Sequence, residues 1–303
     1  MSIESDLVDF RAGWAVAPAP LELLEVGGPD RERLLHGLVT GEIRRLASGS
    51  VAQGFFTTGQ GRILADYRLL AHDEKLWLLI PAGAAAALLL HLEKYRLASR
   101  VELRAAAGLP IFSGGGSRPV AAGDELFTAA DPVALTPRFL LLPRDPALAG
   151  DPARTMDGDA LERLGLHRVG AEVLELARIE DGELRFGVDF GAENFPQETG
   201  RASAVSYNKG CFLGQEVVAR IHYRGGVQKK PCGLRFEGGK LAPAGAELTL
   251  EGRAVGRATS VADSPELGAI GLGILHQRGA EPGTMLAFEG GEARVVALPF
   301  EKS

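Results

Sequence analysis

The chain has 303 residues, a length typical of two domains or of three small ones. Hydrophobic residues make up 46% and charged residues 24%, ordinary globular proportions that argue against a disordered, collagen-like or coiled-coil chain. The net charge of −6 argues against polyanion binding by the whole surface, so nucleic acid would need a local basic patch.

The cysteine count and the apolar segments bear on the compartment. Two cysteines, Cys211 and Cys232, are too few for a disulfide framework. Residues 1–6 are acidic and lack the positive region of a secretory signal. The most apolar stretch, residues 82–92, has about half of the ~20 residues needed to cross a bilayer. We therefore expect a cytoplasmic protein with no membrane partner.

The first hundred residues predict an antiparallel sheet accompanied by helices. Three strands follow one another at hairpin spacing, which favours antiparallel pairing. Asp30 can cap one helix, and Pro81 is well placed to begin another. In chain order we expect a strand at 21–26, a helix from Asp30 to the step at Gly41, strands at 51–58, 62–70 and 75–80, and a helix over about 82–97.

The second part of the chain is less regular. Residues 108–123 are the least structured stretch, and Ser113 to Ser117 is expected to form a flexible loop or linker. Short strands separated by Gly and Pro follow Val217, where helix signals fade, and predict a small β-barrel of about 75 residues. The other expected elements are a buried strand at 139–142, helices at 157–164 and 171–179, and barrel strands at 247–250, 254–258 and 293–296. The fold class is therefore α+β, with helices against antiparallel sheets.

Several common chemical signatures are absent from the sequence. It has no Walker A motif, no dinucleotide-binding fingerprint, no His-Glu-x-x-His and no paired Cys-x-x-Cys. The six histidines are scattered, and none forms a ligand pair at helical spacing. We expect no metal site.

The most informative stretch runs from Asn208 to Arg220. Gly210 and Gly214 bracket Cys211 and permit tight backbone geometry. A thiol between Lys209 and the start of a helix is in a setting that favours the thiolate. The alternative is that Cys211 is a small buried hydrophobic residue in a tight turn.

This stretch carries a resemblance to a known family. Lys209-Gly-Cys-Phe-Leu-Gly-Gln-Glu216, followed by Val218-Ala-Arg220, resembles the signature of the YgfZ folate-binding proteins, relatives of the aminomethyltransferase (T-protein) of the glycine cleavage system. Further segments that resemble the family are 31–43, 56–66, 178–182, 196–198 and 255–265. The resemblance implies a three-domain fold like that of the T-protein: a discontinuous folate-binding α+β domain (1–48 and 104–225), a domain of antiparallel sheet plus helix (49–103), and a carboxy-terminal barrel (226–303).

The resemblance implies that tetrahydrofolate, or another folate, is the cofactor. Glu180 lies where the family keeps the carboxylate that reads the pterin ring, and Glu198 is the second candidate. A carboxylate can accept two parallel N–H bonds from an aminopyrimidine. The alternative is that Glu180 is a solvated helix carboxylate. Asp66 is the second position of the T-protein's Asp-Asp pair, whose first position is Ala65 here; it either lies near folate or caps a hairpin.

Cations are expected for the anionic tail of folate. Residues 217–236 contain five basic residues and no acidic one. Arg220 or Arg224 could clamp a carboxylate, Tyr223 could stack on the benzoyl ring, and Lys209 is included among the cofactor contacts. The alternative interpretation of this segment is a solvated linker that enters the barrel.

The YgfZ group is linked to the maintenance of iron–sulfur enzymes, including those that methylthiolate tRNA. One cysteine cannot hold a cluster. Cys211 would therefore be a reactive thiol, a bridging ligand shared with a partner, or a redox-sensitive site, with His222 as a possible base. Cys232 is interpreted as barrel core. The candidate catalytic residues are Cys211 and Asp66.

We therefore expect a tetrahydrofolate-binding protein that supports iron–sulfur cluster assembly or repair and tRNA modification. The partners would be folate and iron–sulfur or tRNA-modifying enzymes. One alternative is a folate-dependent aminomethyltransferase, the one-carbon transfer that the family implies if the protein is catalytic. The other is an RNA-binding module that uses the basic segment 220–235.

Overall fold

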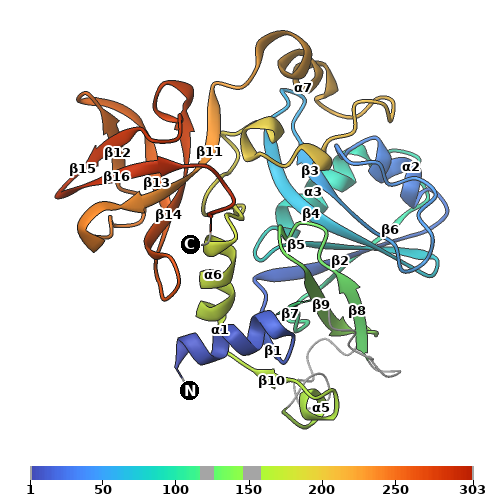
Figure 1. Ribbon diagram of the computed structural model, residues 1–303. Helices are drawn as coiled ribbons and strands as arrows, with labels where there is room; N and C mark the ends of the chain where they lie inside the picture. Colours follow the sequence, from blue (N-terminus) through green and yellow to red (C-terminus); the bar gives the residue numbers. More distant parts are fainter. Residues whose placement is uncertain (1, 117–125, 146–157, 302–303) are drawn as a thin grey trace. The chain divides into compact units, whose positions relative to one another are not determined.

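Figure 1 shows the computed structural model, which describes residues 2–116, 126–145 and 158–301. The chain forms two compact units, each described by itself below. Unit 1 comprises residues 1–58, 64–174 and 203–213, and unit 2 comprises residues 59–63, 175–202 and 214–303. The division into three domains remains a prediction. No helix in the described part of the chain is long and apolar enough to span a membrane.

Unit 1 contains a five-stranded sheet in the order β3-β4-β5-β2-β6. Antiparallel pairing joins β4 to β5, β5 to β2 and β2 to β6, which confirms the antiparallel prediction (Figure 1). Buried aliphatic and aromatic side chains of this sheet pack against two helices. The elements are β2 (Leu21–Gly27), α2 (Arg31–His36), β3 (Val51–Thr57), β4 (Ile63–His72), β5 (Lys75–Pro81), α3 (Ala85–Arg96) and β6 (Glu102–Ala106).

Two predicted helix starts are wrong in detail. Pro81 is the last residue of β5, where it pairs with Leu21, and α3 begins only at Ala85. Asp30 precedes α2, but its side chain makes no capping hydrogen bond to that helix. Its carboxylate instead accepts a hydrogen bond from the Arg100 backbone N–H (2.8 Å), so it ties α2 to the chain after α3.

A second sheet of unit 1 has the order β10-β1-β7-β9-β8. The prediction of a loop beginning at Ser113 is wrong, because residues 112–115 form a strand between β1 and β9. Ser117, at the end of that predicted loop, lies outside the described residues, as does Asp157 at the start of a predicted helix. The elements are α1 (Ile3–Ala12), β1 (Ala15–Pro18), β7 (Phe112–Gly115), β8 (Leu126–Ala130), β9 (Arg138–Pro143), α5 (Gly158–Arg163) and β10 (His167–Arg168).

The glycines of β7 are needed for space. A Cβ atom on Gly114 would lie 2.2 Å from the Phe139 ring. A Cβ atom on Gly115 would lie 2.5 Å from the backbone oxygen of Phe10 in α1. A glycine-rich strand therefore lets the first helix pack directly against the sheet.

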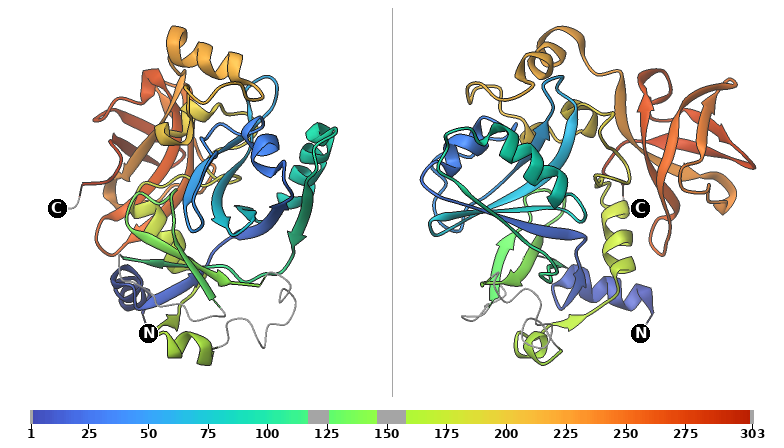
Figure 2. Two further views of the ribbon diagram at one scale, coloured as in Figure 1. Left: turned by 90° about the vertical axis from the view of Figure 1, so that its right-hand side faces the viewer. Right: turned by 180° about the vertical axis from the view of Figure 1, so that it is seen from behind.

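Unit 2 ends in a closed barrel with the strand order β11-β14-β13-β12-β15-β16, which confirms the predicted carboxy-terminal barrel. Alternate residues of β11 (Cys232, Leu234 and Phe236) point into its core, so Cys232 is barrel core as expected. Outside the barrel, Ile179 packs with Leu267 and other apolar residues. The elements are α6 (Ala171–Glu180, with residues 171–174 in unit 1), the 3₁₀ turns η2 (Pro196–Thr199) and η3 (Ala202–Ala204, with residues 203–204 in unit 1), α7 (Gln215–Arg220), the π-helical turn η4 (Ile221–Gly225), β11 (Lys229–Phe236), β12 (Glu247–Leu250), β13 (Arg253–Ser264), β14 (Gly268–His276), β15 (Met285–Phe288) and β16 (Gly291–Val296). Figure 2 shows the barrel from two further sides.

Substitution of Gly115 tests the close packing of α1 on β7. Gly115→Ala should lower the free energy of unfolding by about 1–3 kcal/mol, because its methyl group meets backbone that cannot move aside. Gly158→Ala is the matched control, since a Cβ atom there meets no heavy atom within 4 Å. Urea denaturation compares the two variants. Equal midpoints for Gly115→Ala and the wild type would contradict the packing described.

Candidate functional site

The predicted site residues are distributed over both units. We describe each set within its own unit. Unit 1 holds Asp66, Lys209 and Cys211, whereas unit 2 holds Glu180, Glu198, Arg220, Tyr223 and Arg224.

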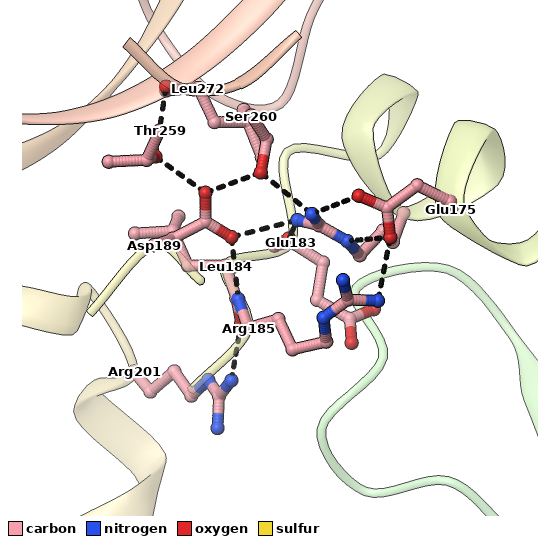
Figure 3. Close-up of polar contacts among 10 residues, drawn as sticks. Glu175, Glu183, Leu184, Arg185, Asp189, Arg201, Thr259, Ser260 and Leu272 are labelled. Carbon is pink, nitrogen blue, oxygen red and sulfur yellow. Dashed lines mark hydrogen bonds and ion pairs between the residues drawn. The ribbon is translucent and has the colours of Figure 1, made fainter. Parts of the chain in front are cut away.

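The polar centre of unit 2 is the buried guanidinium of Arg178. Figure 3 shows residues of the polar network around it, among them Glu175, Asp189 and Ser260. Arg178 Nη1 donates to Asp189 Oδ2 (2.8 Å) and to the carbonyl of Glu183 (3.1 Å). Its Nη2 donates to Ser260 Oγ (2.7 Å), and its Nε donates to Glu175 Oε2 (2.9 Å). One side chain of α6 therefore binds the following loop and barrel strand β13.

Asp189 completes this network. Its Oδ1 accepts hydrogen bonds from the hydroxyls of Thr259 (2.5 Å) and Ser260 (2.6 Å), both in β13. Its Oδ2 also accepts the backbone N–H of Arg185 (2.9 Å). The carboxylate thus has a donor on every side, which is what a buried charge requires.

The charges of the network shift the pKa of its members. Burial alone would raise the pKa of Glu175, but hydrogen bonds and charges from Arg178 and Arg185 outweigh it, and the pKa is lowered. Burial would lower the pKa of Arg178, yet Glu175 and Asp189 hold it above the ordinary value. Both groups therefore remain charged at neutral pH.

Glu180 is the last residue of α6 and only 3% exposed. Its Oε1 accepts a hydrogen bond from Ser264 Oγ (2.5 Å), at the end of β13. The same hydroxyl accepts the backbone N–H groups of Glu266 (3.1 Å) and Leu267 (2.8 Å), which orients its proton toward Glu180. The solvated interpretation of Glu180 is wrong, because the carboxylate is buried and held by the barrel.

Glu198 is also buried, within the turn η2. Its Oε2 accepts hydrogen bonds from Asn194 Nδ2 (3.0 Å) and from the backbone N–H of Phe195 (3.2 Å). These bonds satisfy donors at the start of the turn, as a capping carboxylate does. They give Glu198 a structural contact besides its predicted role in folate binding.

The predicted cations and Tyr223 lie on α7 and η4. Arg220 donates to Glu216 Oε1 (2.8 Å) one helical turn earlier, in an exposed pair of small energetic weight. Tyr223 is 68% exposed and contacts the ring of His222 edge-on, with centroids 4.7 Å apart. Arg224 is exposed as well. This segment forms the helical approach to the barrel.

Asp66 lies inside strand β4 and is buried. Its neighbours Ala65 and Tyr67 belong to the apolar core on the other face of the sheet. Asp66 is therefore a buried carboxylate within a strand, and its role, near folate or as a cap of the hairpin, stays a prediction.

Lys209 is buried and connects its segment to the chain after α2. Its Nζ donates to the carbonyls of Val39 (2.7 Å) and Gly41 (2.6 Å). Its own carbonyl lies 2.9 Å from His36 Nε2 and accepts from Arg44 Nη2 (3.0 Å). Burial is the main cause that lowers the pKa of Lys209 to about 8.

Cys211 is exposed, so the interpretation of it as a buried hydrophobic residue is wrong. It follows Gly210, whose φ of +95° favours glycine. Beyond the cysteine, Leu213 donates its N–H to Gly37 (2.9 Å) and accepts from Thr57 Oγ1 (2.6 Å). Lys209 and Leu213 thus hold both ends of the turn, and the thiol stands at the surface between them.

Known proteins resemble both the sequence and the fold. The family described as Glycine cleavage T-protein C-terminal barrel domain matches residues 229–302. The human mitochondrial iron-sulfur cluster assembly factor IBA57 is 31% identical over 263 residues, which cover 78% of this chain and 71% of that protein. The chain belongs to the YgfZ/T-protein-like family.

Two further comparisons agree with this family. The tRNA-modifying protein YgfZ of Edwardsiella ictaluri is 25% identical over 248 residues, which cover 75% of this chain and 72% of that protein. The crystal structure of the glycine cleavage system aminomethyltransferase T from Bartonella henselae has a TM-score of 0.84 at 20% identity and covers 99% of this chain. The match also covers 90% of the aminomethyltransferase chain. This similarity confirms the predicted T-protein-like fold.

Within this YgfZ/T-protein-like chain, sequence reasoning missed the Arg178–Asp189 network. Arg178 was noticed only as part of a resembling segment, and Asp189 was not singled out. A usable signal is the adjacent pair of hydroxyl residues, Thr259 and Ser260, in barrel strand β13.

The lowered pKa of Lys209 predicts a pH-dependent contribution to stability. The unfolded chain holds this lysine near its ordinary pKa of 10.5, and the folded chain near 8. Between these values the unfolded state binds more protons, so the free energy of unfolding gains from Lys209 as pH rises. Relative to Lys209→Met, the wild type should gain about 1–3 kcal/mol from pH 7 to pH 10.5.

Urea denaturation at several pH values gives this difference, in which the titration of other groups cancels. Lys94→Met, at an exposed lysine on α3, is the control and should give a flat difference. A flat difference for Lys209→Met would show that the buried ammonium has an ordinary pKa.

Proposed function

We propose that this protein binds tetrahydrofolate and supports the assembly or repair of iron–sulfur clusters, including those of tRNA-modifying enzymes. The buried Glu180 carboxylate carries the folate part of this proposal. Held by Ser264 at the end of α6, it is a preorganised acceptor of the kind that an aminopyrimidine edge requires. The relatives named as an iron–sulfur assembly factor and as tRNA-modifying proteins support the second part.

The other predicted residues take roles suited to their chemistry. Asp66 and Glu198 are further carboxylates for the pterin or for the reduced ring nitrogens. Arg220 and Arg224 are exposed guanidinium groups that pair with the tail carboxylates, and Tyr223 stacks on the benzoyl ring. Lys209, whose ammonium is bound to two carbonyls, contributes by fixing the segment that carries Cys211.

Cys211 is the group proposed to act on a partner. A thiol is a nucleophile and a metal ligand only as the thiolate, and it must be accessible. The turn meets the second condition, because it exposes the cysteine and both of its ends are held. We propose that the thiolate contacts a cluster or a reactive group carried by an iron–sulfur partner, in the cytoplasm where thiols stay reduced.

A folate titration with a Glu180 variant tests the cofactor. Glu180→Gln should weaken tetrahydrofolate binding by about 30-fold or more, about 2 kcal/mol, because a charge-assisted pair is lost. Glu172→Gln, at an exposed carboxylate of the same helix, should bind like the wild type. Anaerobic calorimetry measures both affinities. Wild-type affinity in Glu180→Gln would remove Glu180 from the site.

The folate titration, combined with an assay of tRNA methylthiolation in cells, separates the role of the Cys211 thiol from that of the Glu180 carboxylate. Cys211→Ser should keep folate affinity and lose tRNA methylthiolation in a complemented deletion strain. Cys232→Ala, in the barrel core, should keep both if it folds. Release of methylene-tetrahydrofolate and ammonia from an aminomethyl-lipoyl carrier would instead establish the aminomethyltransferase activity.

A further inference from the structure

We infer that unit 1 carries a docking surface for a partner protein segment that presents an apolar side chain next to carboxylates. We call it the α2–α3 surface. It consists of an apolar pocket and a basic groove that adjoin at Arg33. The residues that define it are Leu34, Leu38, Tyr95 and Leu97 in the pocket and Arg31, Arg33, His36 and Arg44 in the groove.

The pocket has a volume of about 370 Å³ and lies between α2 and the chain that follows α3. Leu34 and Leu38 are buried at its base, where they belong to the core of the sheet. Tyr95 and Leu97 form its other wall. Concave, mainly apolar sites of this size accept one or two apolar side chains.

Leu97 is the strongest sign that the pocket is used. It is 89% exposed, the most exposed of the large apolar side chains in the described part of the chain. Its backbone has φ +47° and ψ −121°, and Ser99 N donates to Arg96 O (2.8 Å). This is the first central position of a type II′ turn, where glycine is the favoured residue. The chain therefore keeps a strained, exposed leucine that contributes no burial to the fold.

The groove beside the pocket has a volume of about 550 Å³ and contains three arginines against two acidic residues, Asp30 and Glu32. Arg31 donates to the carbonyl of Gly28 (3.1 Å) and has no carboxylate partner among the described residues. The side chain of Arg33 is 68% exposed, although it pairs with Asp30. Guanidinium groups that are exposed or have no carboxylate partner can pair with carboxylates from a second molecule.

The mixture of features favours a protein over a nucleic acid. Asp30 and Glu32 within the groove would repel a phosphate backbone, which requires a surface of one sign. An apolar centre with charged residues at its edge is the usual anatomy of a protein interface. A segment with an apolar anchor followed by Asp or Glu satisfies both parts of the surface.

The α2–α3 surface is connected to the Cys211 turn. Two of its residues, His36 and Arg44, contact the carbonyl of Lys209, and Gly37 accepts the N–H of Leu213. A segment bound on α2 would therefore sit on the residues that hold the turn. In this respect the inference rests on the proposed function, since it gives the chemistry of the protein that meets the thiol.

Selection from a random 12-residue peptide library on phage tests the surface. The full chain is the target, and the double variant Arg33→Glu, Leu97→Asp is used for counter-selection. We expect enriched peptides with an apolar residue close to Asp or Glu. Failure to enrich any peptide, enrichment of basic peptides, or equal binding to the double variant would each overturn the inference.

Synthetic copies of an enriched peptide then give affinities by fluorescence anisotropy. Leu97→Asp and Arg33→Glu should each weaken binding about tenfold, whereas Leu135→Asp and Arg163→Glu, at exposed positions elsewhere in unit 1, should not. Leu97→Gly should weaken binding as well, yet keep or raise the melting temperature because it relieves the turn. Equal peptide affinity in Leu97→Gly and the wild type would contradict the role of Leu97.

Two further measurements, of RNA binding and of folate affinity, distinguish a protein partner from RNA and this surface from the folate site. A 20-nucleotide single-stranded RNA whose binding falls with Arg33→Glu but not with Leu97→Asp would replace the protein partner by RNA. Tetrahydrofolate affinity should be unchanged in all surface variants. Loss of peptide binding with intact folate binding supports a separate surface, whereas loss of both would contradict it.

Discussion

The arrangement of unit 2 depends on one buried ion pair, between Arg178 and Asp189. Both side chains are almost inaccessible to water, so each would be costly to bury alone. Together they satisfy one another, and the remaining donors and acceptors are met by Thr259, Ser260 and Glu175. A buried polar network that is only partly satisfied is more costly than an apolar core, so arrangements that break some of these bonds are disfavoured. The network therefore fixes the end of α6 against β13 in one register.

Glu180 inherits its position from this constraint. It follows Arg178 by two residues on the same helix, and its own contact with Ser264 lies on the same barrel strand. A carboxylate placed in this way is rigid before any ligand arrives, which lowers the entropic cost of binding. In unit 1 the candidate reactive group is exposed instead of buried. Lys209 is buried and anchors the turn, whereas Cys211 lies at the surface. Unit 2 thus contains a buried carboxylate in a fixed position, and unit 1 contains an exposed thiol.

Regular alternation and hairpin spacing were enough to predict four of the five strands of the first sheet but only three of the six barrel strands, because these signals are local. The strand at residues 112–115 was missed for a physical reason. Glycines normally indicate loops, but here they remove the Cβ atoms that would collide with Phe139 and with the backbone of Phe10. That requirement arises from tertiary packing and has no signature in the neighbouring sequence.

The candidate site residues also divide into those that local sequence could predict and those that depend on contacts between distant parts of the chain. The segment around Cys211 could be recognised because its residues are consecutive. The function of Lys209 as an anchor could not, because its acceptors lie about 170 residues earlier in the chain. Likewise Arg178 meets Ser260 across 82 residues. Family resemblance directed attention to Glu180, while the reason for its fixed position appears only in three dimensions.

The central claim is that the Arg178–Asp189 pair positions Glu180 for folate. Anaerobic calorimetry with tetrahydrofolate on Asp189→Asn, combined with urea denaturation of the same sample, tests it most directly. The account predicts that both the free energy of unfolding and the folate affinity fall, the latter about tenfold or more. A variant that is less stable but still folded, and that binds tetrahydrofolate as tightly as the wild type, would contradict it.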